Sequence, residues 1–90
     1  MSDIPRMKTV TYTKEAEKTL AKMPANLAAK IRAKMVQYAT DPASLANNVI
    51  AMKGQPGFYR MRIGDWRVIF TEDGVVILVV KVAPRGGAYE

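Results

Sequence analysis

Apolar and charged residues alternate along the segment GFYRMRIGDWRVIF, residues 57–70. Side chains two positions apart in a strand share a face, so this alternation predicts strands over Phe58–Ile63 and Trp66–Thr71. Gly64-Asp65 between them is typical of a two-residue hairpin turn. One face of the first strand would carry Phe58, Arg60 and Arg62, and the other Tyr59, Met61 and Ile63.

The predicted hairpin brings arginines together. A two-residue turn pairs Ile63 with Trp66 and therefore places Arg62 opposite Arg67, with Arg60 opposite Ile69. Like charges that face each other across strands are destabilising. We therefore interpret this cluster as a site that holds an anion.

The N-terminal half predicts one strand and two helices. Met7–Tyr12 alternates and is rich in β-branched residues, which favours a strand. Thr13 is a suitable N-cap, Pro24 separates the two helices, and Asp41-Pro42 ends the second. The apolar stripes are Ala16, Leu20 and Met23 in the first helix, and Leu27, Ile31, Met35 and Tyr38 in the second.

After the helices, residues 43–48 form a polar connector, and Val49–Met52 fits either a turn of helix or an extended segment. Residues 54–57, GQPG, indicate a turn. Val75–Val82 is a near-continuous run of Val, Ile and Leu that predicts a third, largely covered strand, ended or bent by Pro84.

The turn before this last strand decides which residues join the arginines. We favour a three-residue loop, Glu72-Asp73-Gly74, which places Arg67 opposite Val79. Lys81, Ala83 and Arg85 then share the face of Arg67. A shorter loop, Asp73-Gly74 alone, would instead put Arg67 on the side of Val80.

These elements predict an α+β fold of one domain, residues 1–90, with 1–6 as a loose lead-in. An N-terminal strand and an antiparallel helical hairpin precede a three-stranded antiparallel β-meander, and the helices pack on the sheet. The longest apolar run, Val75–Val80, is too short to cross a bilayer. The N-terminus lacks the apolar stretch of a secretory signal, so we expect a cytoplasmic protein with no membrane partner.

Charge and composition limit the kinds of partner and of catalytic chemistry that this chain can have. The net charge of +6 and the isoelectric point of about 9.8 favour a polyanionic partner. The chain has no cysteine and no histidine. Histidine-based acid–base catalysis is thus excluded and a zinc site is disfavoured. We expect neither a metal nor a cofactor.

The candidate residues of the site are Arg60, Arg62, Arg67, Lys81, Arg85 and Tyr89. Guanidinium groups hold phosphate in bidentate geometry and can stabilise the charge of an in-line transition state. RNA brings its own nucleophile, the 2′-OH, so cleavage needs a proton acceptor, for which Tyr89, Lys81, Lys53 or a carboxylate are available. The alternative is a basic face that only binds. Lys30 and Lys34 are either a further phosphate-contacting surface or a solvated helix face.

The segment from Met52 to Phe70, MKGQPGFYRMRIGDWRVIF, resembles the central motif of the RelE/ParE toxin superfamily. The ending VAPRGGAY resembles the family's terminal pattern of an arginine followed by a tyrosine. The resemblance covers nearly the whole chain from Met7. It implies a strand, two helices and a β-meander, in agreement with the order predicted above.

The resemblance also implies a function. The chain would be the toxin of a bacterial type II toxin–antitoxin system, neutralised by a cognate antitoxin and associated with operator DNA only through it. RelE-like members cleave mRNA in the ribosomal A site; ParE-like members inhibit DNA gyrase instead. The RelE site falls on Arg60, Arg62, Arg67, Arg85 and Tyr89. From the charge pattern we add four lysines as RNA-binding residues: Lys53, Lys81, Lys30 and Lys34. The first two positions are lysines in well-known RelE enzymes, and arginine is a poor proton acceptor, so that role would pass to Tyr89.

Overall fold

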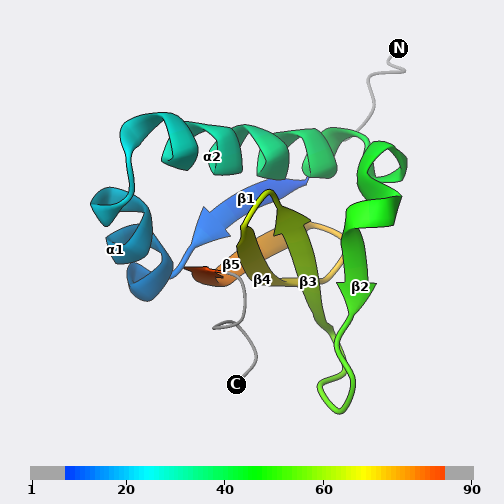
Figure 1. The fold of residues 1–90 in the computed structure, drawn as a ribbon. Coiled ribbons are helices and arrows are strands. Elements are labelled where there is room, and N and C mark those ends of the chain that lie inside the picture. Colours follow the sequence, from blue (N-terminus) through cyan, green and yellow to red (C-terminus); the bar gives the residue numbers. More distant parts are fainter. Residues whose placement is uncertain (1–7, 85–90) are drawn as a thin grey trace.

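The computed structural model describes residues 8–84. Its elements are β1 (Thr9–Tyr12), α1 (Lys14–Lys22), α2 (Ala25–Thr40), a run of 3₁₀ turns η1 (Pro42–Asn48), β2 (Val49–Ala51), β3 (Phe58–Ile63), β4 (Trp66–Glu72) and β5 (Val76–Pro84). In this part of the chain, five strands form one sheet in the order β1-β5-β4-β3-β2 (Figure 1). β1 runs parallel to β5 and the other neighbours are antiparallel. The predicted α+β fold is confirmed: an N-terminal strand and helices precede an antiparallel meander.

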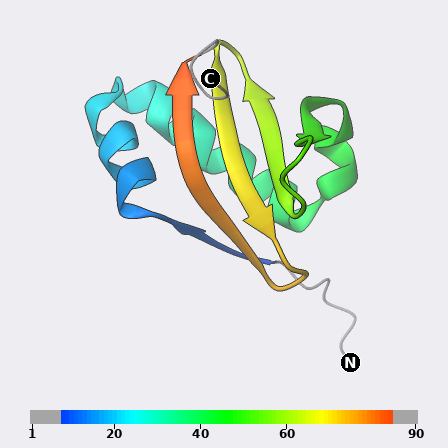
Figure 2. The same cartoon turned by 90° about the horizontal axis from the view of Figure 1, so that it is seen from below.

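The helices cover one face of the sheet. α1 contacts β5 and β1, and α2 contacts β1 and η1. Seen from below, the strands lie in front of the helices, and no helix of the described residues covers the near face (Figure 2). We call this near face the open face. Among residues 8–84, no helix has the length and apolar character needed to span a membrane.

Thr13 fixes the start of α1 and ties it to the sheet. As predicted for an N-cap, its Oγ1 accepts a hydrogen bond from the Ala16 backbone N–H at 3.1 Å. The same hydroxyl donates to the Val80 carbonyl at 3.1 Å. The helices are linked in turn by an ion pair between Glu17 and Arg32, with N and O atoms 2.6 Å apart. One threonine therefore sets both the beginning of α1 and its position over β5.

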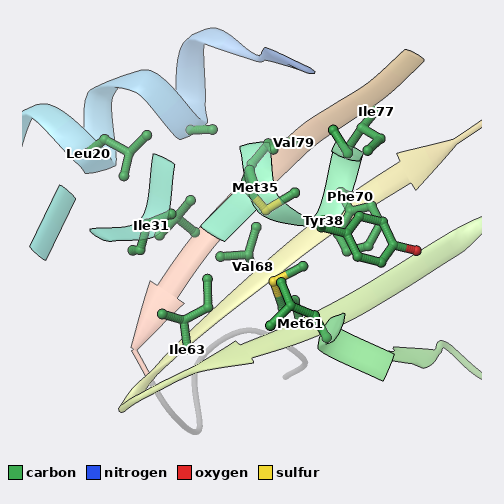
Figure 3. Close-up of a cluster of buried hydrophobic side chains, with 14 of the residues drawn as sticks. Leu20, Ile31, Met35, Tyr38, Met61, Ile63, Val68, Phe70, Ile77 and Val79 are labelled. Atoms are coloured by element: carbon green, nitrogen blue, oxygen red, sulfur yellow. The ribbon is translucent and has the colours of Figure 1, made fainter. Parts of the chain in front are cut away.

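The core lies between the helices and the sheet (Figure 3). Phe70 is fully buried at its centre, with the Tyr38 ring edge-on at 5.2 Å and the Tyr59 ring stacked at 5.7 Å between centroids. The predicted apolar stripes supply the helix side of this core, and Leu27 packs at its edge. The buried stripe residues are Ala16, Leu20, Met23, Ile31, Met35 and Tyr38.

The β3–β4 hairpin has the predicted register. Ile63 pairs with Trp66, Arg62 with Arg67, and Arg60 with Ile69. Gly64 has φ of 59°, the left-handed conformation that a tight hairpin turn needs at this position. Because strand side chains alternate, this register sends Met61 and Ile63 into the core and the arginines to the open face.

The predicted register between β4 and β5 is wrong. Arg67 pairs with Ala83 instead of Val79, because the pair next to the turn is Glu72–Ile77, which leaves four residues, 73–76, between the paired positions. Between the pairs Ile69–Lys81 and Phe70–Val79, β5 also contains one extra residue, Val80, which forms a bulge. Lys81 and Ala83 nevertheless lie on the same face of the sheet as Arg67, as predicted. Arg85 lies outside the described residues.

The segment after the helices also differs from a plain connector. Residues 42–48 form the turns of η1, and Leu45 within it is buried in the core. Val49–Ala51 is extended and pairs with β3 as an edge strand, which resolves the two possibilities left open by its sequence. The first strand begins at Thr9, and Met7 lies outside the described residues.

Replacing Phe70 tests the core. We expect Phe70→Ala to lower the free energy of unfolding by about 3–5 kcal/mol, because the cavity lies between Tyr38 and Tyr59, which already pack on other residues. Phe70→Leu refills much of the volume and should cost roughly half as much. Val36→Ala, on the exposed side of α2, is the control and should change it by less than about 0.5 kcal/mol. Urea unfolding measures all three; a loss below about 1 kcal/mol for Phe70→Ala would contradict this assignment.

Replacing Asp73 tests the β4–β5 turn. Its carboxylate accepts hydrogen bonds from the backbone N–H groups of Val75 and Val76 at 2.9 and 2.8 Å, and these bonds lower the pKa of Asp73 below its ordinary 3.8. A lowered pKa stabilises the fold above pH 3.8, and this contribution is lost as pH falls through the folded-state value.

We therefore expect Asp73→Asn to melt at a lower temperature than wild type at pH 7, with the difference shrinking below about pH 4. Asp65→Asn, in the other hairpin turn, is the matched control, since its carboxylate accepts no hydrogen bond within residues 8–84. Thermal unfolding followed by circular dichroism between pH 2.5 and 7 measures both variants. A difference that does not depend on pH would show that the Asp73 charge does not matter.

Candidate functional site

Strands β3 and β4 gather three arginines on the open face. Arg60 and Arg62 come from β3, and Arg67 from β4 directly opposite Arg62. Their neighbours in sequence, Met61 and Val68, are fully buried on the helix side. The alternation that builds the core thus forces the arginines together on the other face.

These arginines line a shallow cleft of about 180 Å³, which we call the arginine cleft. Its described lining residues are Arg60, Arg62, Arg67, Asn47, Asn48 and Ile50, without a carboxylate among them. Asn48 connects the end of η1 to β3, because its Nδ2 donates to the Arg62 carbonyl at 3.1 Å. The cleft is therefore cationic, with amide groups on one wall.

Arg67 is the most unusual residue of this cleft. Its side chain is buried, with only 8% of the residue exposed, and its Nη1 donates to the Trp66 carbonyl at 3.3 Å. Residues 8–84 contain two ion pairs, Lys8–Glu72 and Arg32–Glu17, and neither includes Arg67. A buried charge without an opposite charge is costly. An anion in the cleft would supply that missing charge, with the bidentate geometry that guanidinium prefers.

Apolar side chains lie beside the arginines. Ile69 and Ala83, each 6% exposed, form a small cluster on the open face together with Met52, Phe58 and Val80. Ile69 pairs with Arg60 on one side and Lys81 on the other, and Ala83 pairs with Arg67. The cations of the open face therefore lie around a small apolar cluster.

The structure groups some of the predicted lysines with the arginines and separates others. Lys81 is half-buried on the open face, two strands from Arg60 and outside the lining of the arginine cleft. Lys53 is exposed in the turn between β2 and β3, at the other end of β3 from Gly64. Lys30 and Lys34 of α2 line an adjacent cleft of about 230 Å³, which includes Arg62 and Asn48. Arg85 and Tyr89 lie outside the described residues, so their part in the site remains a prediction.

Sequence reasoning missed Asn47, Asn48 and Ile50, all of which line the arginine cleft. They belong to a segment that looked like a connector, and only the pairing of β2 with β3 brings them to the arginines. The signal that could have identified them is the polar pair Asn47-Asn48 directly before a short apolar run, which is typical of the start of an edge strand.

The described tyrosine and carboxylate nearest the end of β4 lie on the helix side, away from the cleft. The Tyr38 hydroxyl donates to Glu72 Oε1 at 2.9 Å, and Lys8 pairs with the same carboxylate. Burial, with the hydrogen bond to Glu72 next in importance, raises the pKa of Tyr38. These groups therefore fasten β4 to α2 and do not supply a proton acceptor for the cleft. The arginine cleft, as residues 8–84 form it, can therefore bind a phosphate and polarise it.

The fold matches those of known toxins. A chain of the archaeal RelE-RelB complex from Pyrococcus horikoshii OT3 superimposes with a TM-score of 0.76 at 27% identity, over 92% of this chain and 100% of that one. A chain of the intact Escherichia coli RelBE toxin-antitoxin complex gives 0.70 at 18% identity, over 86% and 95%. A chain of the E. coli DinJ-YafQ toxin-antitoxin complex gives 0.66 at 12% identity, over 94% and 100%. The last two likenesses show the fold alone.

The sequence itself matches a family. Among curated proteins, none matches this chain. The model of the family described as ParE toxin of type II toxin-antitoxin system, parDE, matches residues 10–89, which include every element from β1 to β5 except the first residue of β1. The predicted resemblance is thereby confirmed: this chain belongs to the RelE/ParE toxin superfamily and is a toxin of a type II toxin–antitoxin system.

Proposed function

We propose that this toxin is a ribosome-dependent endoribonuclease that cleaves mRNA in the A site and so stops translation. The observation that carries the proposal is Arg67, a buried guanidinium without a carboxylate partner in residues 8–84, set in a cleft with two further arginines. Such a site is suited to one phosphodiester of a bound RNA. The similarity to the archaeal RelE supports an RNA substrate.

In the proposed reaction, the 2′-OH attacks the adjacent phosphorus, its proton passes to a base, and the bond to the 5′ oxygen breaks. The products are a 2′,3′-cyclic phosphate and a 5′ oxygen, which takes up a proton and becomes a 5′-OH. Arg60, Arg62 and Arg67 would hold the non-bridging oxygens and stabilise the additional negative charge of the transition state. Every part of this role is electrostatic, so it needs neither a cofactor nor a histidine.

Proton transfer requires a different residue. Arginine remains protonated at working pH, and the asparagines and Ile50 of the cleft do not titrate. We assign the proton acceptor to Tyr89, whose phenolate would be favoured by surrounding arginines, and additional charge stabilisation to Arg85. Lys81 and Lys53 would contact more distant phosphates of the RNA.

A cognate antitoxin is the proposed inhibitor. The structures of relatives include RelE-RelB and DinJ-YafQ complexes. The open face combines cations with the apolar cluster around Ile69, so a segment that carries acidic and apolar side chains would cover both. Contact with operator DNA would then occur through the antitoxin.

The second candidate is a ParE-like inhibitor of DNA gyrase. The family description names ParE, and the described lining of the arginine cleft includes no tyrosine, lysine or carboxylate. In that case the arginines would bind an acidic surface or DNA without chemistry.

A toxicity experiment separates the two candidates. We expect induced wild-type toxin to stop protein synthesis before DNA synthesis, with new mRNA 5′ ends inside codons by primer extension. Arg67→Ala should abolish these ends while antitoxin binding persists, and Lys14→Ala on the exposed side of α1 should behave as wild type. Tyr89→Phe should slow single-turnover cleavage on ribosomes by about 10²-fold or more, as loss of a general base does. DNA synthesis arrest without new 5′ ends would refute the nuclease proposal and support the gyrase one.

The burial of the Arg67 charge also predicts that activity and stability conflict at this position. Arg67→Met keeps an unbranched stem beside Ala83, the strand partner of Arg67, and removes the buried charge. We expect the free energy of unfolding to remain equal to that of wild type or rise by up to about 2 kcal/mol, while toxicity is lost. Arg62→Met, at the exposed neighbour, should leave stability within about 0.5 kcal/mol. A loss of more than about 1 kcal/mol for Arg67→Met would mean that Arg67 is retained for the fold.

A further inference from the structure

A second group of clefts begins where the arginine cleft ends. Arg62 and Asn48 line both the arginine cleft and the cleft beside Lys30 and Lys34. That second cleft shares Lys30, Ile63 and Gly64 with a third, of about 250 Å³, which is also lined by Trp66. Through these shared residues the three clefts adjoin one another from the open face, past the β3–β4 turn, to α2. We call them together the edge groove.

The cations of this groove are spaced along it. Lys30 and Lys34 are one helical turn apart on α2 and face the end of β3, where Arg62 is exposed. Asp65 is the one carboxylate among its described lining residues, and it lies near the end away from the arginine cleft. A chain of phosphates leaving the arginine cleft would therefore meet Arg62, then Lys34 and Lys30.

An aromatic side chain lies at the far end. Trp66 is half-buried: one part packs against the core, and its remaining surface lines the third cleft and a neighbouring apolar hollow with Met23 and Pro24. Such a ring is a platform on which a nucleobase can stack, and stacking is favourable for every base. An indole at the end of a cationic groove is the combination found in single-strand binding sites.

We propose that the edge groove binds the single-stranded RNA that flanks the scissile phosphate, with its phosphates on Arg62, Lys34 and Lys30 and one base stacked on Trp66. The inference rests on the proposed function only in taking the ligand of the arginine cleft to be RNA. It adds a binding segment outside that cleft, so the toxin grips several nucleotides and not one phosphate alone.

The single tryptophan makes the inference measurable. The probe is a six-nucleotide 2′-O-methyl RNA, which lacks the attacking hydroxyl and cannot be cut, so binding is separated from catalysis. We expect its titration to quench the Trp66 fluorescence, with the same dissociation constant as the anisotropy of the labelled RNA. Tripolyphosphate should compete for binding without quenching, because it has no base.

Matched variants locate the contacts. Lys30→Ala/Lys34→Ala should weaken binding about fivefold to tenfold and reduce the slope of log affinity against log salt by about 1.4, or 0.7 for each phosphate contact. Lys14→Ala/Lys18→Ala removes the same charge from exposed positions of α1 that line no part of the groove, and should change affinity less than about twofold. Trp66→Leu should weaken binding about tenfold, whereas Trp66→Phe, which keeps a ring, should recover most of it.

Three results would overturn the inference: RNA binding without quenching, equal losses in the two lysine pairs, or no binding by the wild type. The first would mean that Trp66 serves only the core, and the second that net charge alone attracts RNA. A groove that binds the probe while ribosomal cleavage is absent would refute the nuclease proposal and leave this inference standing. Ribosomal cleavage by a toxin whose groove does not bind the probe would refute this inference and leave the nuclease proposal standing.

Discussion

The structure depends on the register of the β3–β4 hairpin. A slip of one residue would turn Met61, Val68 and Phe70 to solvent and drive the arginines into the core. The tight turn at Gly64 and the aromatic contacts of Phe70 both oppose such a slip. The same alternation therefore builds the core on one face of the hairpin and the arginine cleft on the other. The free energy gained by burying the core residues offsets the repulsion between the arginines.

The hairpin was predictable because its information is local. Alternation, a glycine at the turn and opposed arginines all lie within residues 57–70, and each was confirmed in the structure. The helices were predictable for the same reason, since the capping by Thr13 and the apolar stripes are features of neighbouring residues. Membership of the toxin superfamily followed from the same local motif.

The features that the sequence could not predict depend on contacts between residues that are far apart in the chain. The β4–β5 register depends on a bulge at Val80, whose carbonyl accepts from Thr13, a residue 67 positions earlier in the chain. The Asp73 carboxylate moves the turn by accepting from Val75 and Val76. The Asn47 and Asn48 side chains reach the site only because β2 pairs with β3. In each case a tertiary contact decided between local alternatives.

Burial divides the cations of this small fold into two groups. Lys30, Lys34 and Arg62 lie on exposed or half-exposed surface, where a phosphate contact is weak and sensitive to salt. Arg67 is buried, so water screens its charge little and each of its charge interactions is stronger. Weak exposed contacts suit a surface that binds RNA of any sequence, whereas in the proposed reaction a desolvated cation suits the phosphate at which negative charge increases. The same burial makes the charge of Arg67 costly in the free toxin, because residues 8–84 supply no carboxylate partner for it.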